Sequence, residues 1–142
     1  MAIWTIIFGI FTLAILLAQY LLQRSNFRLA LYDKRYAVFL SAMEYISKIV
    51  QSARVEDDEL MKLLRNSKDK EFLFGSEVGD YIQSLYSHGV DLEKVRSLLD
   101  VEKNQTQRER LVTQQTELFR WFKNQFEEGK RCFEPYLAIR SK

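Results

Sequence analysis

Residues 2–22 read AIWTIIFGIFTLAILLAQYLL, and this stretch decides how the rest of the chain is interpreted. It contains no Lys, Arg, Asp or Glu. As a helix that rises 1.5 Å per residue, it is roughly 30 Å long, which is the thickness of a bilayer's hydrocarbon core. Trp4 and Tyr20 lie near its two ends, where amphipathic rings favour the membrane interface. The sequence therefore predicts a transmembrane helix over residues 1–23 and a second domain over residues 24–142.

Two other interpretations of this stretch fit the residues less well. A cleaved signal peptide has a basic amino-terminal region, a shorter apolar run and a small-residue cleavage site. Here the first basic residue is Arg24, after the apolar run. A buried helix of a water-soluble core rarely has an apolar surface all round. A membrane span is the interpretation that agrees with length, composition and flanking charge together.

The charges after this stretch predict its orientation. The cations Arg24, Arg28, Lys34 and Arg35 follow it, against one acid, Asp33. Positively charged flanks stay on the cytoplasmic side of a membrane. We therefore expect a single-pass protein of the cytoplasmic (inner) membrane, with its amino terminus outside and its bulk in the cytoplasm. Arg24 and Arg28 would lie at the headgroups, which makes the lipid bilayer the first expected partner.

The second domain contains every Lys, Arg, Asp and Glu of the chain, and its pattern is helical. The whole chain has one Pro and five Gly, too few for a turn-rich β fold. Apolar residues recur at spacings of three and four, as on one face of a helix. The predicted fold is all-α: an N-terminal transmembrane helix followed by a cytoplasmic bundle of four or five helices.

The first cytoplasmic helix carries an apolar seam with alternating spacings of four and three, as in a heptad pattern. Its members are Tyr32, Tyr36, Phe39, Met43, Ile46 and Val50. Such a seam packs either inside the bundle or on a partner protein, and the sequence leaves both open.

Later boundaries follow from glycine, proline and polar runs. Gly89 is predicted to end one helix, because glycine tolerates the backbone conformation of a helix end, and Asp91 to cap the next. Residues 102–110 are all polar, and we expect two helices joined by an exposed turn there rather than one solvated helix. Pro135 is predicted to stop the last helix, so that residues 133–137 pack back on the bundle as a tail.

Two features are typical of contact residues. Trp121 lies off the apolar stripe of its helix, and Trp is enriched at the energetic centres of protein interfaces, so it is the candidate exposed anchor. A partly buried Trp is the alternative.

Asp33 has no basic residue four positions further on. We therefore expect Asp33 and Arg35 to lock the first helix against the segment over residues 72–75 or against the tail.

Motifs for catalysis or metal binding are missing from the sequence. His88 and Cys132 are the only His and Cys, too few for the usual zinc sites. Phosphate-binding glycine loops and the G-x-S-x-G turn of serine hydrolases do not occur. Basic residues of the last helix alternate with acids, which is typical of a solvated surface rather than a nucleic-acid interface. We expect no enzyme activity, cofactor, metal, nucleic-acid partner or small-molecule substrate.

Three blocks of this chain resemble a pattern found in uncharacterised bacterial small single-pass membrane proteins with a cytoplasmic helical domain. The blocks are FRLALYDKRYAVF at residues 27–39, FLFGSEV at residues 72–78 followed by Tyr81 and Ile82, and FEPYL at residues 133–137. The resemblance implies a bacterial protein of that architecture. It brings no catalytic residues and no activity.

We therefore expect a membrane-tethered interaction module, a tether, accessory subunit or scaffold that binds another protein or further copies of itself. The alternative is a small membrane effector of the toxin or phage-defence type, which oligomerises and perturbs the bilayer. Replacement of Gly9 by leucine should inactivate such an effector and leave a tether unaffected, because small residues allow close helix approach in membranes.

Overall fold

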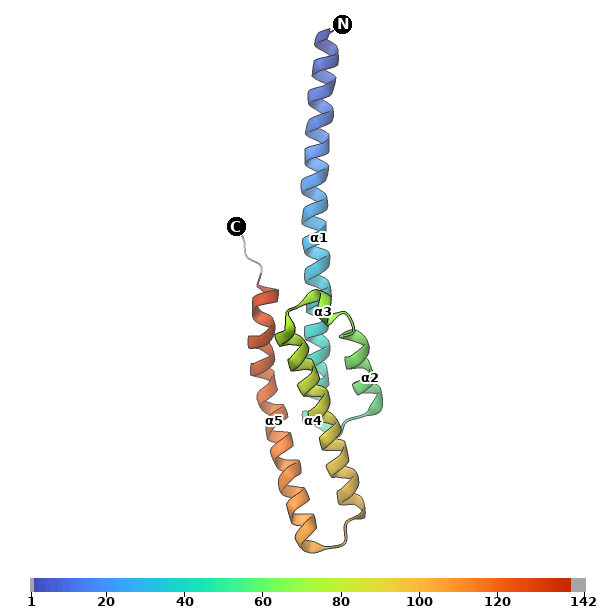
Figure 1. Cartoon of the computed structure of the whole chain (residues 1–142), viewed down its shortest axis with the longest axis vertical. Coiled ribbons are helices and arrows are strands. Elements are labelled where there is room, and N and C mark those ends of the chain that lie inside the picture. Colours follow the sequence, from blue (N-terminus) through green and yellow to red (C-terminus); the bar gives the residue numbers. More distant parts are fainter. Residues whose placement is uncertain (1, 139–142) are drawn as a thin grey trace. The chain divides into compact units, whose positions relative to one another are not determined.

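The computed structural model of this chain describes residues 2–138, without the side chain of Ala2, and these residues form helices and no strand (Figure 1). The all-α prediction is confirmed. The helices are α1 (Ala2–Ser52), α2 (Asp57–Asn66), α3 (Lys70–Leu73), α4 (Ser76–Val101) and α5 (Gln105–Leu137).

The chain divides into two compact units between Lys34 and Arg35, within α1. The second unit thus begins later than the predicted boundary at residue 24. In the first unit, the side chains of residues 3–30 are exposed, and none of the most apolar part of α1 is buried. This part of α1 is long and apolar enough to cross a membrane.

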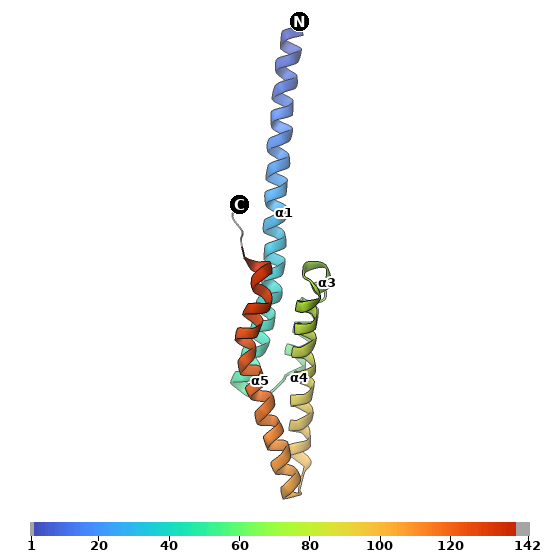
Figure 2. The ribbon, with the colours of Figure 1, turned by 60° about the vertical axis from the view of Figure 1, so that its left-hand side comes forward.

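The second unit is built on a hairpin of α4 and α5, which run side by side in both views (Figure 2). The carboxyl-terminal part of α1, from Arg35 onward, packs on this hairpin, and α2 packs on α1. Tyr45 of α1 meets Phe122 of α5 edge to face, with ring centroids 6.3 Å apart. Phe39 meets Phe133 of α5 in the same way, at 5.4 Å.

The core face of α1 is rotated by one residue relative to the predicted seam. Its buried apolar side chains are Val38, Ala42, Tyr45, Ile46 and Ile49. Of the predicted seam, only Ile46 is fully buried, whereas Tyr36 is 41% exposed and Tyr32, Phe39, Met43 and Val50 are intermediate. The apolar stripe is wide enough to contain both lines, and packing against the hairpin selects the line that includes the small residue Ala42.

The predicted helix boundary at Gly89 and Asp91 is wrong, because α4 continues through both residues. Gly89 serves close packing instead: a Cβ atom there would collide with the hydroxyl of Tyr45. Pro135 does not stop α5 either, since the helix extends to Leu137. Only the last two residues of α5 lie beyond Pro135, and Tyr136 packs on Phe74 with 5.2 Å between ring centroids.

The polar run after α4 is mostly helical. Residues 102–104 form the turn, and α5 begins at Gln105. The Asn104 side chain caps the new helix by accepting a hydrogen bond from the backbone N–H of Gln107 at 3.2 Å. The expected pair of helices joined by an exposed turn is therefore present.

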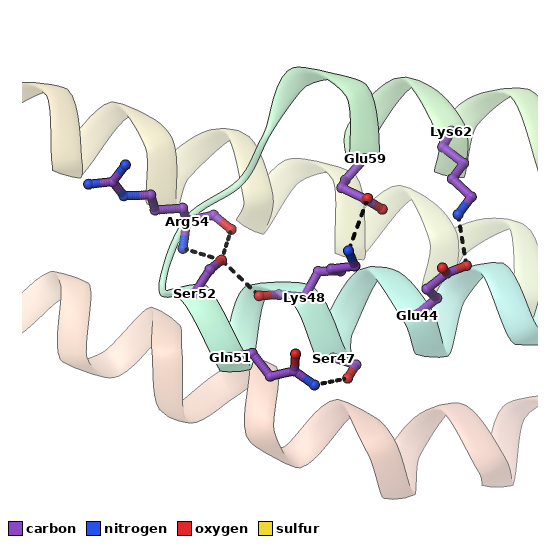
Figure 3. A network of polar contacts seen from close by, with 8 residues as sticks. All are labelled: Glu44, Ser47, Lys48, Gln51, Ser52, Arg54, Glu59 and Lys62. Atoms are coloured by element: carbon purple, nitrogen blue, oxygen red, sulfur yellow. Dashed lines mark hydrogen bonds and ion pairs between the residues drawn. The ribbon is translucent and has the colours of Figure 1, made fainter.

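Polar contacts hold α2 on α1 and close the turn between them (Figure 3). Lys62 lies 3.0 Å from the Glu44 carboxylate, a hydrogen bond that raises the pKa of Lys62, and Lys48 lies 3.7 Å from Glu59. Exposed pairs of this kind add little stability. The hydroxyl of Ser52 donates to the Lys48 carbonyl at 2.8 Å.

Candidate functional site

Arg35 connects three segments at one end of the second unit. Its Nε donates a hydrogen bond to the carbonyl oxygen of Leu73 at 2.8 Å. Its guanidinium carbon lies 5.5 Å from the ring centroid of Tyr136, within cation–π distance. Arg35 therefore contacts both the 72–75 segment and residue 136 of the tail, whereas the sequence predicted a contact with one or the other. Asp33 is exposed, and its part in such a lock stays a prediction.

Aromatic packing fixes the same end. Phe74 meets Phe133 edge to face at 5.2 Å, and the Tyr136 hydroxyl accepts a hydrogen bond from the backbone N–H of Gly75 at 3.0 Å. Leu73 and Phe74 are buried, as expected of an apolar plug, but Phe72 is 88% exposed. The plug therefore consists of two residues rather than three, because a single turn of helix cannot aim three consecutive side chains at one core.

A tyrosine brings α4 and α5 close together in the middle of the hairpin. The Tyr81 hydroxyl donates to the carbonyl oxygen of Gln125 at 2.9 Å. A Cβ atom on Gly129 would crowd that hydroxyl, at 2.6 Å, and would also clash with Met43. Glycine at this position thus allows the close approach. Burial raises the pKa of Tyr81, and the nearby Cys132 and Glu128 raise it further.

An open groove of about 520 Å³ lies between α4 and α5 beside this contact. Its lining residues are Glu77, Asp80, Tyr81 and Ser84 from α4, and Trp121, Gln125, Glu128, Arg131 and Cys132 from α5. We refer to it as the α4–α5 groove. Every helical turn of α4 from Glu77 to Ser84 contributes a side chain, so the groove follows the helix axis rather than forming a closed cavity.

Trp121 forms part of one wall of the groove and is half-buried rather than fully exposed. Its indole stacks on the His88 imidazole with ring centroids 3.6 Å apart and an interplanar angle of 3°. His88 Nδ1 lies 2.8 Å from the carbonyl oxygen of Ser84, which can only accept, so Nδ1 donates. The two rings form a flat, partly accessible platform whose orientation is set by the α4 backbone.

The charge of the groove is predominantly negative. Glu77, Asp80 and Glu128 contribute carboxylates, whereas Arg131 is the one cation in its lining and lies 3.3 Å from Glu128. Within the described part of the chain, no ion pair involves Glu77 or Asp80. The groove can therefore pair with cationic side chains of a bound molecule.

Cys132, at the same groove, is in a poor environment for nucleophilic chemistry. Burial raises the pKa of its thiol, and the Glu77 carboxylate raises it further. A thiolate is the reactive form of cysteine, and here the charge and burial oppose its formation at neutral pH.

The residues predicted to lie at the membrane interface are all accessible. Trp4 is 75% exposed and Tyr20 61%, and Arg24 and Arg28 are exposed as well. They belong to the first unit, whose apolar surface the chain itself leaves uncovered.

Comparisons of the chain with protein-family models, with curated proteins and with solved structures found no match. Its function has to be argued from these surfaces.

The sequence analysis singled out Trp121 but not the groove acids Glu77 and Asp80, nor the His88 ring that stacks on Trp121. A spacing of three to four from Glu77 through Asp80 and Ser84 to His88 was the available signal for one shared helix face.

Proposed function

We propose that this protein is a membrane-anchored helical interaction module, which holds a partner protein at the cytoplasmic face of the inner membrane. The α1 segment over residues 3–22 is the anchor, and the α4–α5 groove is the partner-binding surface. The observation that carries the proposal is this open, acidic groove with Trp121 in its wall, where the His88 ring stacks on the indole.

The anchor is supported by exposed apolar surface. Ile3, Phe8 and Leu16 are 71%, 75% and 56% exposed, like their neighbours along α1. Leaving such side chains in water costs about 1.5–3 kcal/mol each relative to burial, which a bilayer removes. The basic residues Arg24 and Arg28 follow this surface and favour cytoplasmic placement of everything after them.

The groove favours a partner segment that carries basic side chains. Charge complementarity with Glu77 and Asp80 would orient such a segment. Trp121 would supply the apolar contact area that dominates interface energetics, and an arginine could stack on it as well as pair with a carboxylate. The second unit therefore offers carboxylates that attract a basic segment and an aromatic surface that such a segment can contact.

The test is purification of full-length protein from its native host in mild detergent, with quantitative mass spectrometry of what co-purifies. The variants Trp121→Ala and Asp80→Lys should each lower the recovery of a stoichiometric partner at least tenfold. Asp100→Lys is the matched control, because it makes the same charge change on an exposed residue of α4 outside the groove lining.

Two results would contradict the proposal in different ways. A partner retained equally by all three variants would show that it binds elsewhere on the chain. Absence of any stoichiometric partner from the unmodified protein, at native expression, would count against the module itself.

A further inference from the structure

The two halves of α5 differ in burial. Its buried residues, Phe122, Gln125, Gly129 and Phe133, all lie in the carboxyl-terminal half. None of residues 105–121 is buried, although this half carries Leu111, Val112, Leu118 and Phe119. Helices obtain most of their stability from packing of an apolar face, and in this half of α5 that face is only partly covered.

The cause is the length of α1. This helix ends at Ser52, and Ala53 turns the chain away with a φ of 54°, in the left-handed region that non-glycine residues seldom adopt. The α4–α5 hairpin continues beyond this point (Figure 1 and Figure 2). The hairpin thus loses its third helix at Ala53.

A trough of about 240 Å³ begins where α1 ends. Its lining residues are Ala53, Leu92, Gln115, Thr116 and Phe119. Val112 lies one helical turn before Thr116 and is 47% exposed. Val112, Thr116 and Phe119 have the spacing of four and three that faces a partner helix in a coiled coil. We call these three residues the α5 stripe.

We propose that the α5 stripe is covered by the α4–α5 hairpin of a second copy of this chain, so that two hairpins form a four-helix bundle. Charge supports this occupant. Residues 91–102 of α4 and the turn contain four acids and two bases, whereas residues 103–121 contain four bases and two acids. In a two-fold pair of hairpins, each α5 lies beside the α4 of the second copy, so opposite charges meet.

Symmetry supports the same arrangement. A two-fold axis that runs along the hairpins gives both α5 helices the same sense and makes each neighbouring pair of helices antiparallel, as in up-and-down bundles. Confinement to one membrane, which rests on the proposed anchor, also raises the effective concentration of the second copy.

The dimer surface is independent of the partner-binding groove. Phe119 and Trp121 are two residues apart in a helix of 3.6 residues per turn, so their side chains point in directions roughly 200° apart. A dimer would leave both α4–α5 grooves open, and failure of one surface would not remove the other.

The first test is the mass of the full-length protein in mild detergent and in nanodiscs, by light scattering over a range of concentrations. We expect a dimer, whose dissociation constant rises at least tenfold in Val112→Lys and in Thr116→Lys. Gln114→Lys is the matched control, because this exposed residue lies between them in sequence and outside the trough. Circular dichroism of each variant verifies that the helices are retained.

The second test needs no destabilising substitution. In a Cys132→Ser background, Val112→Cys should be cross-linked to its own copy by a short bis-maleimide in native membranes, and Gln114→Cys should not. A monomer at all concentrations, a dimer that Val112→Lys leaves intact, or equal cross-linking at both cysteines would overturn the proposal.

Discussion

The helix α1 contains two apolar stretches, one with exposed and one with buried side chains. Residues 3–22 are exposed throughout, whereas Val38, Ala42, Tyr45, Ile46 and Ile49 are at most 2% exposed. Both stretches belong to one continuous helix. The difference is that the second has an interleaved polar face and a hairpin to pack on, while the first is apolar all round. A helix that is apolar all round lacks the polar face that a helix half-buried in a bundle presents to water.

The largest expected effect comes from charging the centre of the first stretch. The double variant Ile10→Arg, Leu13→Arg should lose about 6–8 kcal/mol of insertion free energy, because each arginine at a span centre is unfavourable by about 3–4 kcal/mol relative to an aliphatic residue. Extraction of membranes with alkaline carbonate measures the result: the variant should be released. The matched pair Leu21→Arg, Leu22→Arg, beside Arg24, should stay in the membrane. Equal retention of both would mean that protein, not lipid, covers this surface.

In the second stretch, truncation of a buried side chain should lower the free energy of unfolding. Ile46→Ala should lower the free energy of unfolding of the second unit by about 2–5 kcal/mol, because Ile46 is fully buried and its truncation leaves a cavity. Leu40→Ala is the control on the same helix, since Leu40 is 47% exposed, and should change stability by less than about 0.5 kcal/mol. Urea titration of the full-length protein in detergent, followed by near-ultraviolet circular dichroism, gives both values. Similar losses would show that exposure does not separate the two faces.

Alkaline pH should destabilise the second unit selectively. Burial raises the pKa of Tyr45, with a further contribution from Tyr86, and burial likewise raises the pKa of Tyr81. Unfolded tyrosine titrates near pH 10, so above that pH the unfolded chain releases these protons while the folded chain retains them. The free energy of unfolding should therefore fall by roughly 2.7 kcal/mol per pH unit above pH 10, half from each tyrosine. Tyr45→Phe should halve that slope, and an unchanged slope would contradict the assignment.

The smallest effect tests the contact of α1 with α4. Gly89→Ala should destabilise the second unit by about 1–3 kcal/mol, because the added Cβ collides with the Tyr45 hydroxyl. Gly79→Ala should instead stabilise it by about 0.5–1 kcal/mol, since only Lys70 Cε approaches that position, at 4.0 Å. Tyr45→Phe should rescue Gly89→Ala and be neutral or stabilising alone, because the buried hydroxyl has no hydrogen-bond partner among the described residues. Thermal unfolding of the unmodified protein, the three single variants and the double variant measures these differences. If Tyr45→Phe failed to rescue Gly89→Ala, the added Cβ would collide with another group.

Local patterns predicted the elements of this fold better than their ends. The helical class followed from residue spacing, and the turn after α4 followed from the polar run over residues 102–110. The predicted helix ends at Gly89 and Pro135 were wrong, because packing in α4 and α5 accepts residues that end isolated helices. The sequence singled out Trp121 and Arg35, but the groove depends on how α4 and α5 pack together.

The sequence by itself determined what depends on neighbours along the chain. These features are the apolar stretch over residues 2–22, the basic flank that follows it and the all-α pattern of the remainder. The tertiary structure decided which line of α1 faces the core, why Gly89 lies inside a helix, and how Trp121 and three carboxylates come to share one groove. The physical reason is that hydrophobicity and helical period are local properties, whereas helix rotation and close approach depend on the shapes of side chains distant in sequence.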